Sequence, residues 1–75
     1  MPVSERREFN RAREAVAVNI RALRKAKGWS QEKLADEAGI DRTYVGMLER
    51  KLGNPSLRVL SAIAAALGSS TQELM

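Results

Sequence analysis

The chain has 75 residues, of which 44% are hydrophobic and 29% charged, a balance typical of one small folded domain rather than a disordered tail or a membrane protein. It contains neither cysteine nor histidine, which excludes disulfides, zinc fingers and nearly all imidazole catalysis, so we expect no enzyme activity, metal or cofactor. The net charge of +4 and the pI of about 10.1 favour an anionic partner, nucleic acid first, although ordinary solubilising charge gives the same balance.

The sequence carries no signal for a membrane. Its longest apolar run, residues 59–67, is far shorter than the roughly 20 residues that span a bilayer. The N-terminus is charged and does not resemble a signal peptide. Together with the lack of cysteine, these features predict a cytoplasmic protein with no membrane partner.

The first predicted helix follows Pro2, with Ser4 as a candidate N-cap, and continues to Gly28. Its apolar residues recur at helical spacing and predict one buried stripe, made of Phe9, Ala12, Val16, Ile20 and Leu23. The four arginines in its first half, Arg6, Arg7, Arg11 and Arg13, alternate with glutamates, which is typical of a solvated helix face rather than of a DNA-contacting arm.

Two short helices follow. Ser30 is a suitable N-cap for residues 31–38, and Gly39 marks the end of that helix in a left-handed conformation. Asp41 is a suitable cap for the next helix, whose predicted buried stripe consists of Val45, Leu48 and Leu52 and ends at the break formed by residues 53–55.

A fourth helix begins at Ser56, and Ser70 with Glu73 predicts a capping box for a last helical turn. The apolar face of the fourth helix is predicted to consist of Leu57, Leu60, Ile63, Ala64 and Leu67. No run alternates apolar and polar residues as a strand would. The sequence therefore predicts an all-α domain over residues 1–75 with five helices.

Only "GID" joins the second and third helices, so the two must cross at a steep angle, and the small Ala35 allows them to approach. This stretch resembles the phage-repressor and Cro-like (XRE-type) helix-turn-helix family over residues 29–68, from "WSQEKLADEAGI" through "LER" to "NPSL". The resemblance implies a compact lambda-repressor-like DNA-binding domain whose helix-turn-helix covers about residues 31–50.

In this family the third helix enters the DNA major groove, which admits one α-helix. The resemblance therefore implies a base-reading set of Arg42, Thr43, Gly46 and Met47. Arg42 has a forked guanidinium that can bind two acceptors of one guanine, a contact worth about 1–3 kcal/mol of discrimination. For Gly46, tight packing between helices explains the residue equally well, and Met47 is equally well explained as core filler.

Phosphate contacts position such a helix without reading sequence. The candidates are Gln31, Tyr44, Arg50 and Asn54, while Lys33, Lys51 and Arg58 are secondary because a single exposed cation is usually only solvated. For Tyr44 the competing interpretation is a half-buried ring with its hydroxyl in water.

The resemblance also implies an ion pair between Arg24 on the first helix and Glu49 near the end of the third, which would orient the recognition helix. Trp29, the single tryptophan, is interpreted as a core residue between the first two helices.

The "DRTY" stretch followed by "LER" resembles the controller proteins of restriction-modification systems, which are small dimers that regulate their own promoter. With no room for a second domain, we expect dimerisation through residues 56–75, with anchors at Leu57, Leu60, Leu74 and Met75. A two-fold dimer would present its recognition helices about 34 Å apart to a palindromic operator.

Two further interpretations stay open. Glu32 and Asp36 lie where some repressors contact RNA polymerase, although an ordinary solvated face explains the pair as well. The alternative function is an antitoxin-like protein-interaction module that also binds DNA. Antitoxins usually add a neutralising segment, and only the region before Phe9 is available for it here.

Overall fold

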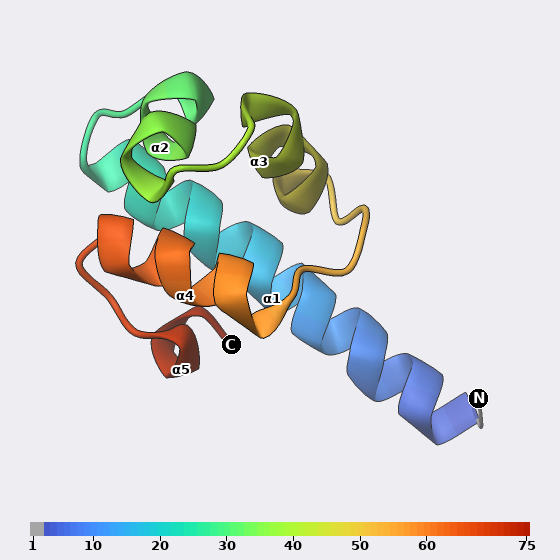
Figure 1. Cartoon of the computed structure of the whole chain (residues 1–75). Helices are drawn as coiled ribbons and strands as arrows, with labels where there is room; N and C mark the ends of the chain where they lie inside the picture. The colour runs from blue at the N-terminus through green and yellow to red at the C-terminus, as the bar shows by residue number, and fades with distance from the viewer. Residues whose placement is uncertain (1–2) are drawn as a thin grey trace.

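The structure, a computed structural model, describes residues 3–75, and within them all regular structure is helical. The elements are α1 (Val3–Ala26), α2 (Gln31–Ala38), α3 (Arg42–Glu49), α4 (Leu57–Ala66) and α5 (Thr71–Leu74). Figure 1 shows α2 to α5 gathered around the C-terminal half of α1, whose N-terminal half projects away from them. The prediction of an all-α fold with five helices is confirmed for these residues.

Helix α1 is longer than the sequence predicted at its N-terminus. It begins at Val3, so Ser4 lies inside the first turn and the prediction that Ser4 caps the helix is wrong. Glutamate and arginine follow Ser4 directly, and these strong helix formers favour a first turn that includes the serine. Further along α1, Val16, Ala17 and Ile20 are buried against the other helices.

Side-chain caps fix where the other four helices begin, at the predicted residues. The capping oxygens accept hydrogen bonds from backbone N–H groups two or three residues ahead, at distances of 2.7–3.1 Å, and belong to Ser30, Asp41, Ser56 and Ser70. Each such cap is worth about 1 kcal/mol. The predicted capping box differs in one detail, because the Glu73 carboxylate accepts from the Ser70 hydroxyl at 3.3 Å.

The turn between α2 and α3 depends on the backbone freedom of Gly39. Its φ is 70°, and the N–H of Ile40 bonds back to the carbonyl of Ala35 at 3.0 Å. A side chain at Gly39 would meet nothing within 4 Å. The left-handed backbone, and not a lack of space, is therefore what requires glycine at this turn.

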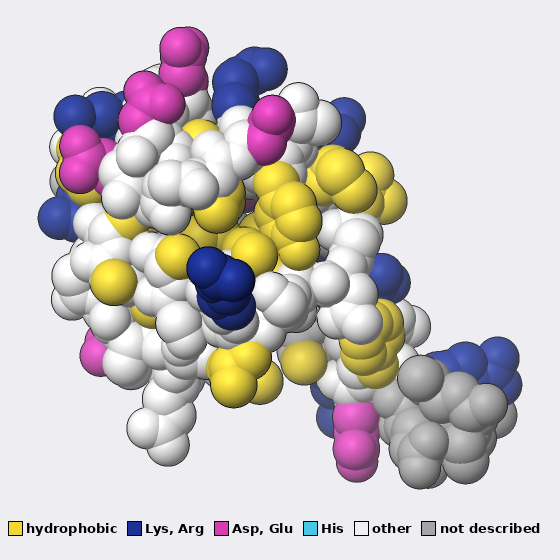
Figure 2. All heavy atoms as spheres, in the orientation of Figure 1, with side chains coloured by type: hydrophobic (Ala, Val, Ile, Leu, Met, Phe, Trp, Pro, Cys, Tyr) yellow, Lys and Arg dark blue, Asp and Glu magenta, His cyan; other side chains and the backbone are white. Residues whose placement is uncertain are grey.

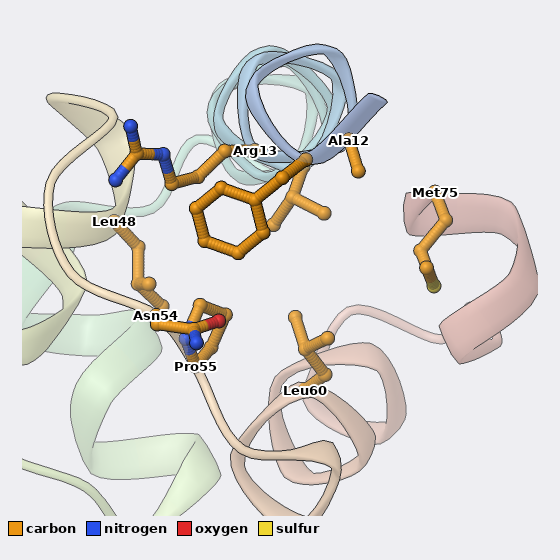
Figure 3. Close-up of a pocket in the computed structure, with 9 residues that line it drawn as sticks. Ala12, Arg13, Leu48, Asn54, Pro55, Leu60 and Met75 are labelled. Atoms are coloured by element: carbon orange, nitrogen blue, oxygen red, sulfur yellow. The ribbon is translucent and has the colours of Figure 1, made fainter. Parts of the chain in front are cut away.

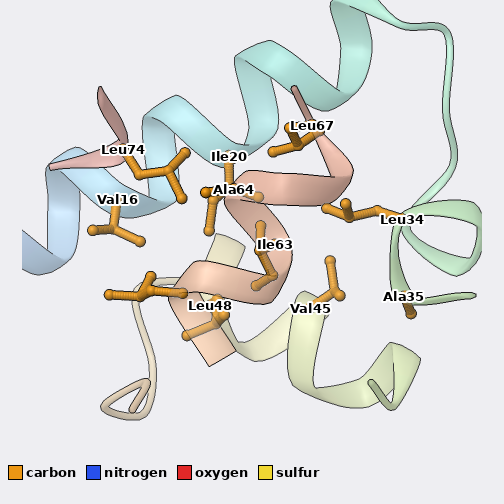
Figure 4. Packing of buried hydrophobic residues seen from close by; sticks show 11 residues of the cluster. Val16, Ile20, Leu34, Ala35, Val45, Leu48, Ile63, Ala64, Leu67 and Leu74 are labelled. Atoms are coloured by element: carbon orange, nitrogen blue, oxygen red, sulfur yellow. The ribbon is translucent and has the colours of Figure 1, made fainter. Parts of the chain in front are cut away.

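The core lies where the five helices meet. Figure 4 shows Ile63 and Ala64 of α4 at its centre, surrounded by side chains from the other helices. The buried members that the sequence predicted are Val16, Ile20, Val45, Leu48, Leu60, Ile63, Ala64 and Leu67, and Leu34, Ala35 and Leu74 join them. Trp29 is half-buried against this cluster, as predicted.

Helix α3 ends earlier than its apolar pattern predicted. The N–H of Leu52 bonds to the carbonyl of Met47 at 2.9 Å and that of Lys51 to Leu48 at 3.1 Å, while Lys51 has a φ of 63°. These bonds form a Schellman motif, which reverses the chain after Arg50. Leu52 consequently turns outward and is 50% exposed, so its predicted place in the buried stripe is wrong.

In the C-terminal region, the division of apolar side chains between the core and the surface differs from the prediction. Leu60 and Leu74 are buried in the core, and Asn19 of α1 donates from Nδ2 to the carbonyl of Leu74 at 2.8 Å. Leu74 has no exposed surface to offer a partner, so predicting it as a dimer anchor was wrong. Leu60 is 7% exposed and lines a mostly apolar hollow that Met75 also lines, so its part in a dimer stays a prediction. Leu57 and Met75 are 70% and 62% exposed. The prediction that Leu57 belongs to the apolar face of α4 is therefore wrong.

None of the helices in residues 3–75 is long and apolar enough to cross a membrane.

Candidate nucleic-acid interface

Helices α2 and α3 together form a polar hollow of about 210 Å³. This hollow, called the α2–α3 hollow below, is lined by Gln31, Arg42, Thr43, Gly46 and Arg50. Three of these are predicted base readers and two are predicted phosphate contacts. The fold therefore brings together five of the eight residues that the sequence analysis assigned to DNA.

The periodicity of α3 explains why its polar residues share the hollow. Val45 and Leu48 are buried beneath the helix, which leaves Arg42 and Thr43 exposed on its first turn. Asp41 Oδ1 accepts from the N–H of Thr43 at 2.7 Å and so fixes the helix start. The first turn of α3 thus presents an arginine and a threonine to solvent on a rigid element.

Gly46 forms part of the hollow because it has no side chain. A Cβ built on Gly46 would lie 3.5 Å from Oε1 of Gln31, which is an ordinary contact distance, and it would meet no other atom more closely. Packing between α2 and α3 therefore does not require glycine here. The bare backbone leaves the Gln31 amide uncovered toward the hollow.

Arg50 closes the C-terminal end of the hollow. It is the C-cap of α3, and its Nε donates to the carbonyl of Gly46 at 3.2 Å. This bond holds the exposed arginine side chain back along its own helix and adds a second donor to a carbonyl that already accepts the backbone N–H of Arg50 at 3.1 Å.

Three predicted DNA contacts lie outside this hollow. Met47 is half-buried, with its Cε 3.5 Å from the position of a Cβ on Gly53, so it packs toward the loop between α3 and α4. The ring of Tyr44 packs against the core, half-buried as in the competing interpretation. Asn54 lines a separate, mostly apolar hollow of about 200 Å³ together with Pro55 (Figure 3).

The predicted ion pair between Arg24 and Glu49 is present and joins α1 to the last residue of α3. Nε and Nη2 of Arg24 donate to the two carboxylate oxygens at 2.7 and 2.8 Å, and Nη1 donates to the carbonyl of Trp29 at 2.7 Å. The two side chains are only 11% and 4% exposed. The guanidinium is thus held at one end of α3 and at the turn before α2.

Gln31 also belongs to this network, through a contact that the sequence did not predict: its Nε2 donates to Oε1 of Glu49 at 3.3 Å. Burial alone would raise the pKa of the Glu49 carboxyl, but hydrogen bonds from Arg24 and Gln31 and the nearby positive charges lower it below its ordinary value. The hydrogen bond to Glu49 in turn raises the pKa of Arg24, against the effect of burial. The signal for this contact was the helix-turn-helix itself, which places the start of α2 beside the end of α3.

The outer face of α2 carries mixed charge. Figure 2 shows acidic and basic side chains side by side over this helix, and Lys33 pairs with Glu37 at 2.9 Å. Glu32 and Asp36 are both exposed. They are accessible to a partner, while the α2–α3 hollow itself is lined by two arginines and no acid.

Comparison with known proteins places this arrangement in a family. A helix-turn-helix family model matches residues 20–74. A hypothetical transcription factor from Neisseria meningitidis is 48% identical over 63 residues, which are 84% of this chain but only 59% of that protein's length.

Two solved structures share the fold. The restriction-modification controller protein C.AhdI from Aeromonas hydrophila has a TM-score of 0.80 at 43% identity, covering 84% of this chain and 96% of that one. The biofilm master regulator SinR, solved in complex with DNA, has a TM-score of 0.75 at 37% identity, covering 79% of this chain and 95% of that one. With its capped α2 and α3, joined by a short turn, and this match over residues 20–74, the chain belongs to the helix-turn-helix family.

Proposed function

We propose that this chain is a sequence-specific double-stranded DNA-binding transcription regulator. The observation that carries the proposal is the α2–α3 hollow, where Arg42 and Thr43 on the first turn of α3 share one surface with Gln31 and Arg50. A helix with an exposed forked cation on its first turn suits the major groove, where base edges present paired acceptors. The DNA-bound structure of SinR supports the same use of this fold.

In this proposal Arg42 and Thr43 read base edges, and Gly46 lets a base or the DNA backbone approach α3 closely. Gln31 and Arg50 contact phosphates on either side of the groove. Met47, Tyr44 and Asn54 do not line the hollow, so we assign them secondary contacts with a thymine methyl or with phosphates. The Arg24–Glu49 ion pair holds the C-terminal end of α3 in place.

We further propose that the chain acts as a homodimer on a palindromic operator. A single α3 reads only a few base pairs, and a two-fold pair of them doubles the site. Leu57 and Met75 are the large apolar residues that the region 56–75 leaves exposed, and they are the anchors of this interface. The similarity to C.AhdI supports a more specific role as a restriction-modification controller protein, with Glu32 and Asp36 contacting RNA polymerase.

Selection of duplexes from a random pool by the purified chain tests this function. We expect enrichment of a palindromic sequence whose half-sites are about one DNA turn apart. Affinity for the selected duplex should fall steeply as salt is raised, because each phosphate contact releases counterions. If no sequence is enriched over the starting pool, the proposed function is wrong.

A further inference from the structure

We infer that Glu49 is a positioning residue for DNA binding, because its carboxylate holds the Gln31 amide in the one orientation that suits the α2–α3 hollow. This inference rests on the proposed function, since it assigns Gln31 a task toward DNA. It gives Glu49, besides its ion pair with Arg24, the role of orienting a side chain on the DNA-binding surface.

Hydrogen-bond chemistry decides which end of the Gln31 amide faces Glu49. An ionised carboxylate can only accept hydrogen bonds. Its Oε1 lies 3.3 Å from Nε2 of Gln31 and 2.8 Å from Nη2 of Arg24. The amide nitrogen must therefore point to Glu49, because the flipped amide would set two acceptors against each other.

This orientation determines what Gln31 offers to DNA. One hydrogen of Nε2 is used by Glu49, so the second remains as a donor for a phosphate oxygen. Oε1 lies over Gly46, whose missing side chain leaves that acceptor uncovered. Gln31 thus presents one donor and one acceptor in fixed places, beside Arg42 and Thr43.

Glu49 has this effect without touching DNA itself. Its side chain is only 4% exposed, and Arg24 neutralises a charge that would otherwise repel phosphate. The carbonyl of Trp29 holds Arg24 from the other side. Because a long, rotamer-rich side chain is ordered before binding, less conformational entropy is lost when the phosphate arrives.

A double-mutant cycle tests the coupling, with Gln31→Ala, Glu49→Gln and the double variant measured against a duplex selected by the wild-type protein. Loss of one phosphate hydrogen bond through Gln31→Ala should weaken binding about three- to tenfold. If Glu49 acts through Gln31, Glu49→Gln should weaken binding by a similar factor. The double variant should then bind no more weakly than either single variant. Costs that multiply in the double variant would overturn the inference while leaving the proposed function intact.

Each variant is measured at a temperature where circular dichroism shows it folded. If Glu49→Gln does not fold, Glu49→Asp replaces it, because the shorter acid keeps a charge for Arg24 and withdraws from Gln31. A second readout needs no DNA. The NMR signal of the Gln31 side-chain amide is identified by its loss in Gln31→Ala. In the wild-type protein this signal should shift on acidification, because Glu49 takes up a proton. A signal that does not shift would contradict the contact.

The two proposals fail in different ways. A wild-type chain that selects no duplex overturns the function and the inference together. A wild-type chain that selects a duplex and shows independent effects of Gln31 and Glu49 overturns the inference alone.

Discussion

Arg24 and Glu49, which lie 25 positions apart in the chain, meet through two hydrogen bonds of 2.7 and 2.8 Å. This pair is the link that connects the first helix to the end of the helix proposed to enter DNA. Because both partners are largely buried, removing either one leaves an uncompensated charge, which typically costs about 3–5 kcal/mol.

The first prediction concerns the pH dependence of stability. Burial would raise the pKa of Glu49, but its hydrogen bonds and the nearby positive charges place the pKa of the folded state below the ordinary value of 4.5. The unfolded chain then binds the proton more readily, so the contribution of Glu49 is complete above about pH 4.5 and is lost as the pH falls through the folded-state pKa.

Urea unfolding between pH 7 and pH 3 measures this contribution. The difference in unfolding free energy between wild type and Glu49→Gln should be largest at neutral pH and shrink on acidification. Two curves that stay parallel over the whole range would show that Glu49 contributes no pH-linked stability.

A second prediction separates the buried and exposed leucines of the C-terminal region. Leu74→Ala should lower the unfolding free energy by about 2–5 kcal/mol, because it opens a cavity in the core. Leu57→Ala is the matched control and should change it by no more than about 0.5 kcal/mol. Since Leu57 is a proposed dimer anchor, sedimentation velocity should instead show that Leu57→Ala weakens self-association.

An equal loss of stability in both variants would contradict the burial that separates these residues. A Leu57→Ala chain that associates as strongly as wild type would remove Leu57 from the proposed interface.

Much of the fold was predictable because its signals are local. Ser30, Asp41, Ser56 and Ser70 cap the helices they were predicted to cap, since a cap depends only on the next three residues. Leu52 was misplaced because its helical spacing continues past the residue where the Schellman turn ends α3. No periodicity within α3 marks that turn.

The error at Leu74 has a different cause. It is an apolar residue on a short helical segment, and the sequence does not show which neighbours cover it. α5 contacts α1, including the hydrogen bond from Asn19 to the Leu74 carbonyl, and Leu74 is buried there. The Gln31–Glu49 contact was missed for the same reason, because it depends on how two separate helices meet.

A third prediction uses the two glycines of the helix-turn-helix. Gly46→Ala should raise the unfolding free energy by up to about 1 kcal/mol, because alanine favours a helix interior. Its new methyl should at the same time weaken binding to the selected duplex by covering the hollow beside Gln31. Gly39→Ala is the matched control. It should lower the unfolding free energy by about 1 kcal/mol, because the φ of 70° at this position is left-handed and disfavours any side chain.

Thermal unfolding and fluorescence anisotropy measure the two effects of Gly46→Ala. A destabilised Gly46→Ala chain would favour the packing interpretation of this glycine, and undiminished binding would exclude a close approach of DNA.

A fourth prediction concerns activation. Glu32 and Asp36 are exposed on α2, and the double charge reversal Glu32→Lys, Asp36→Lys should abolish promoter activation in a reporter strain. Operator binding should persist, because neither residue lines the α2–α3 hollow. Activation at the wild-type level by this variant would exclude the pair as a polymerase contact.

The central claim is that Arg42, on the first turn of α3, reads bases, and the specificity of Arg42→Ala tests it most directly. The measurement compares affinities for the selected operator and for a scrambled duplex, at one salt concentration, for wild type, Arg42→Ala and Gln31→Ala. We predict that Arg42→Ala reduces the ratio of specific to non-specific affinity by about 5- to 150-fold, the equivalent of 1–3 kcal/mol, while Gln31→Ala weakens both duplexes by a similar factor. An Arg42→Ala variant that loses affinity equally for both duplexes would contradict base reading by this residue.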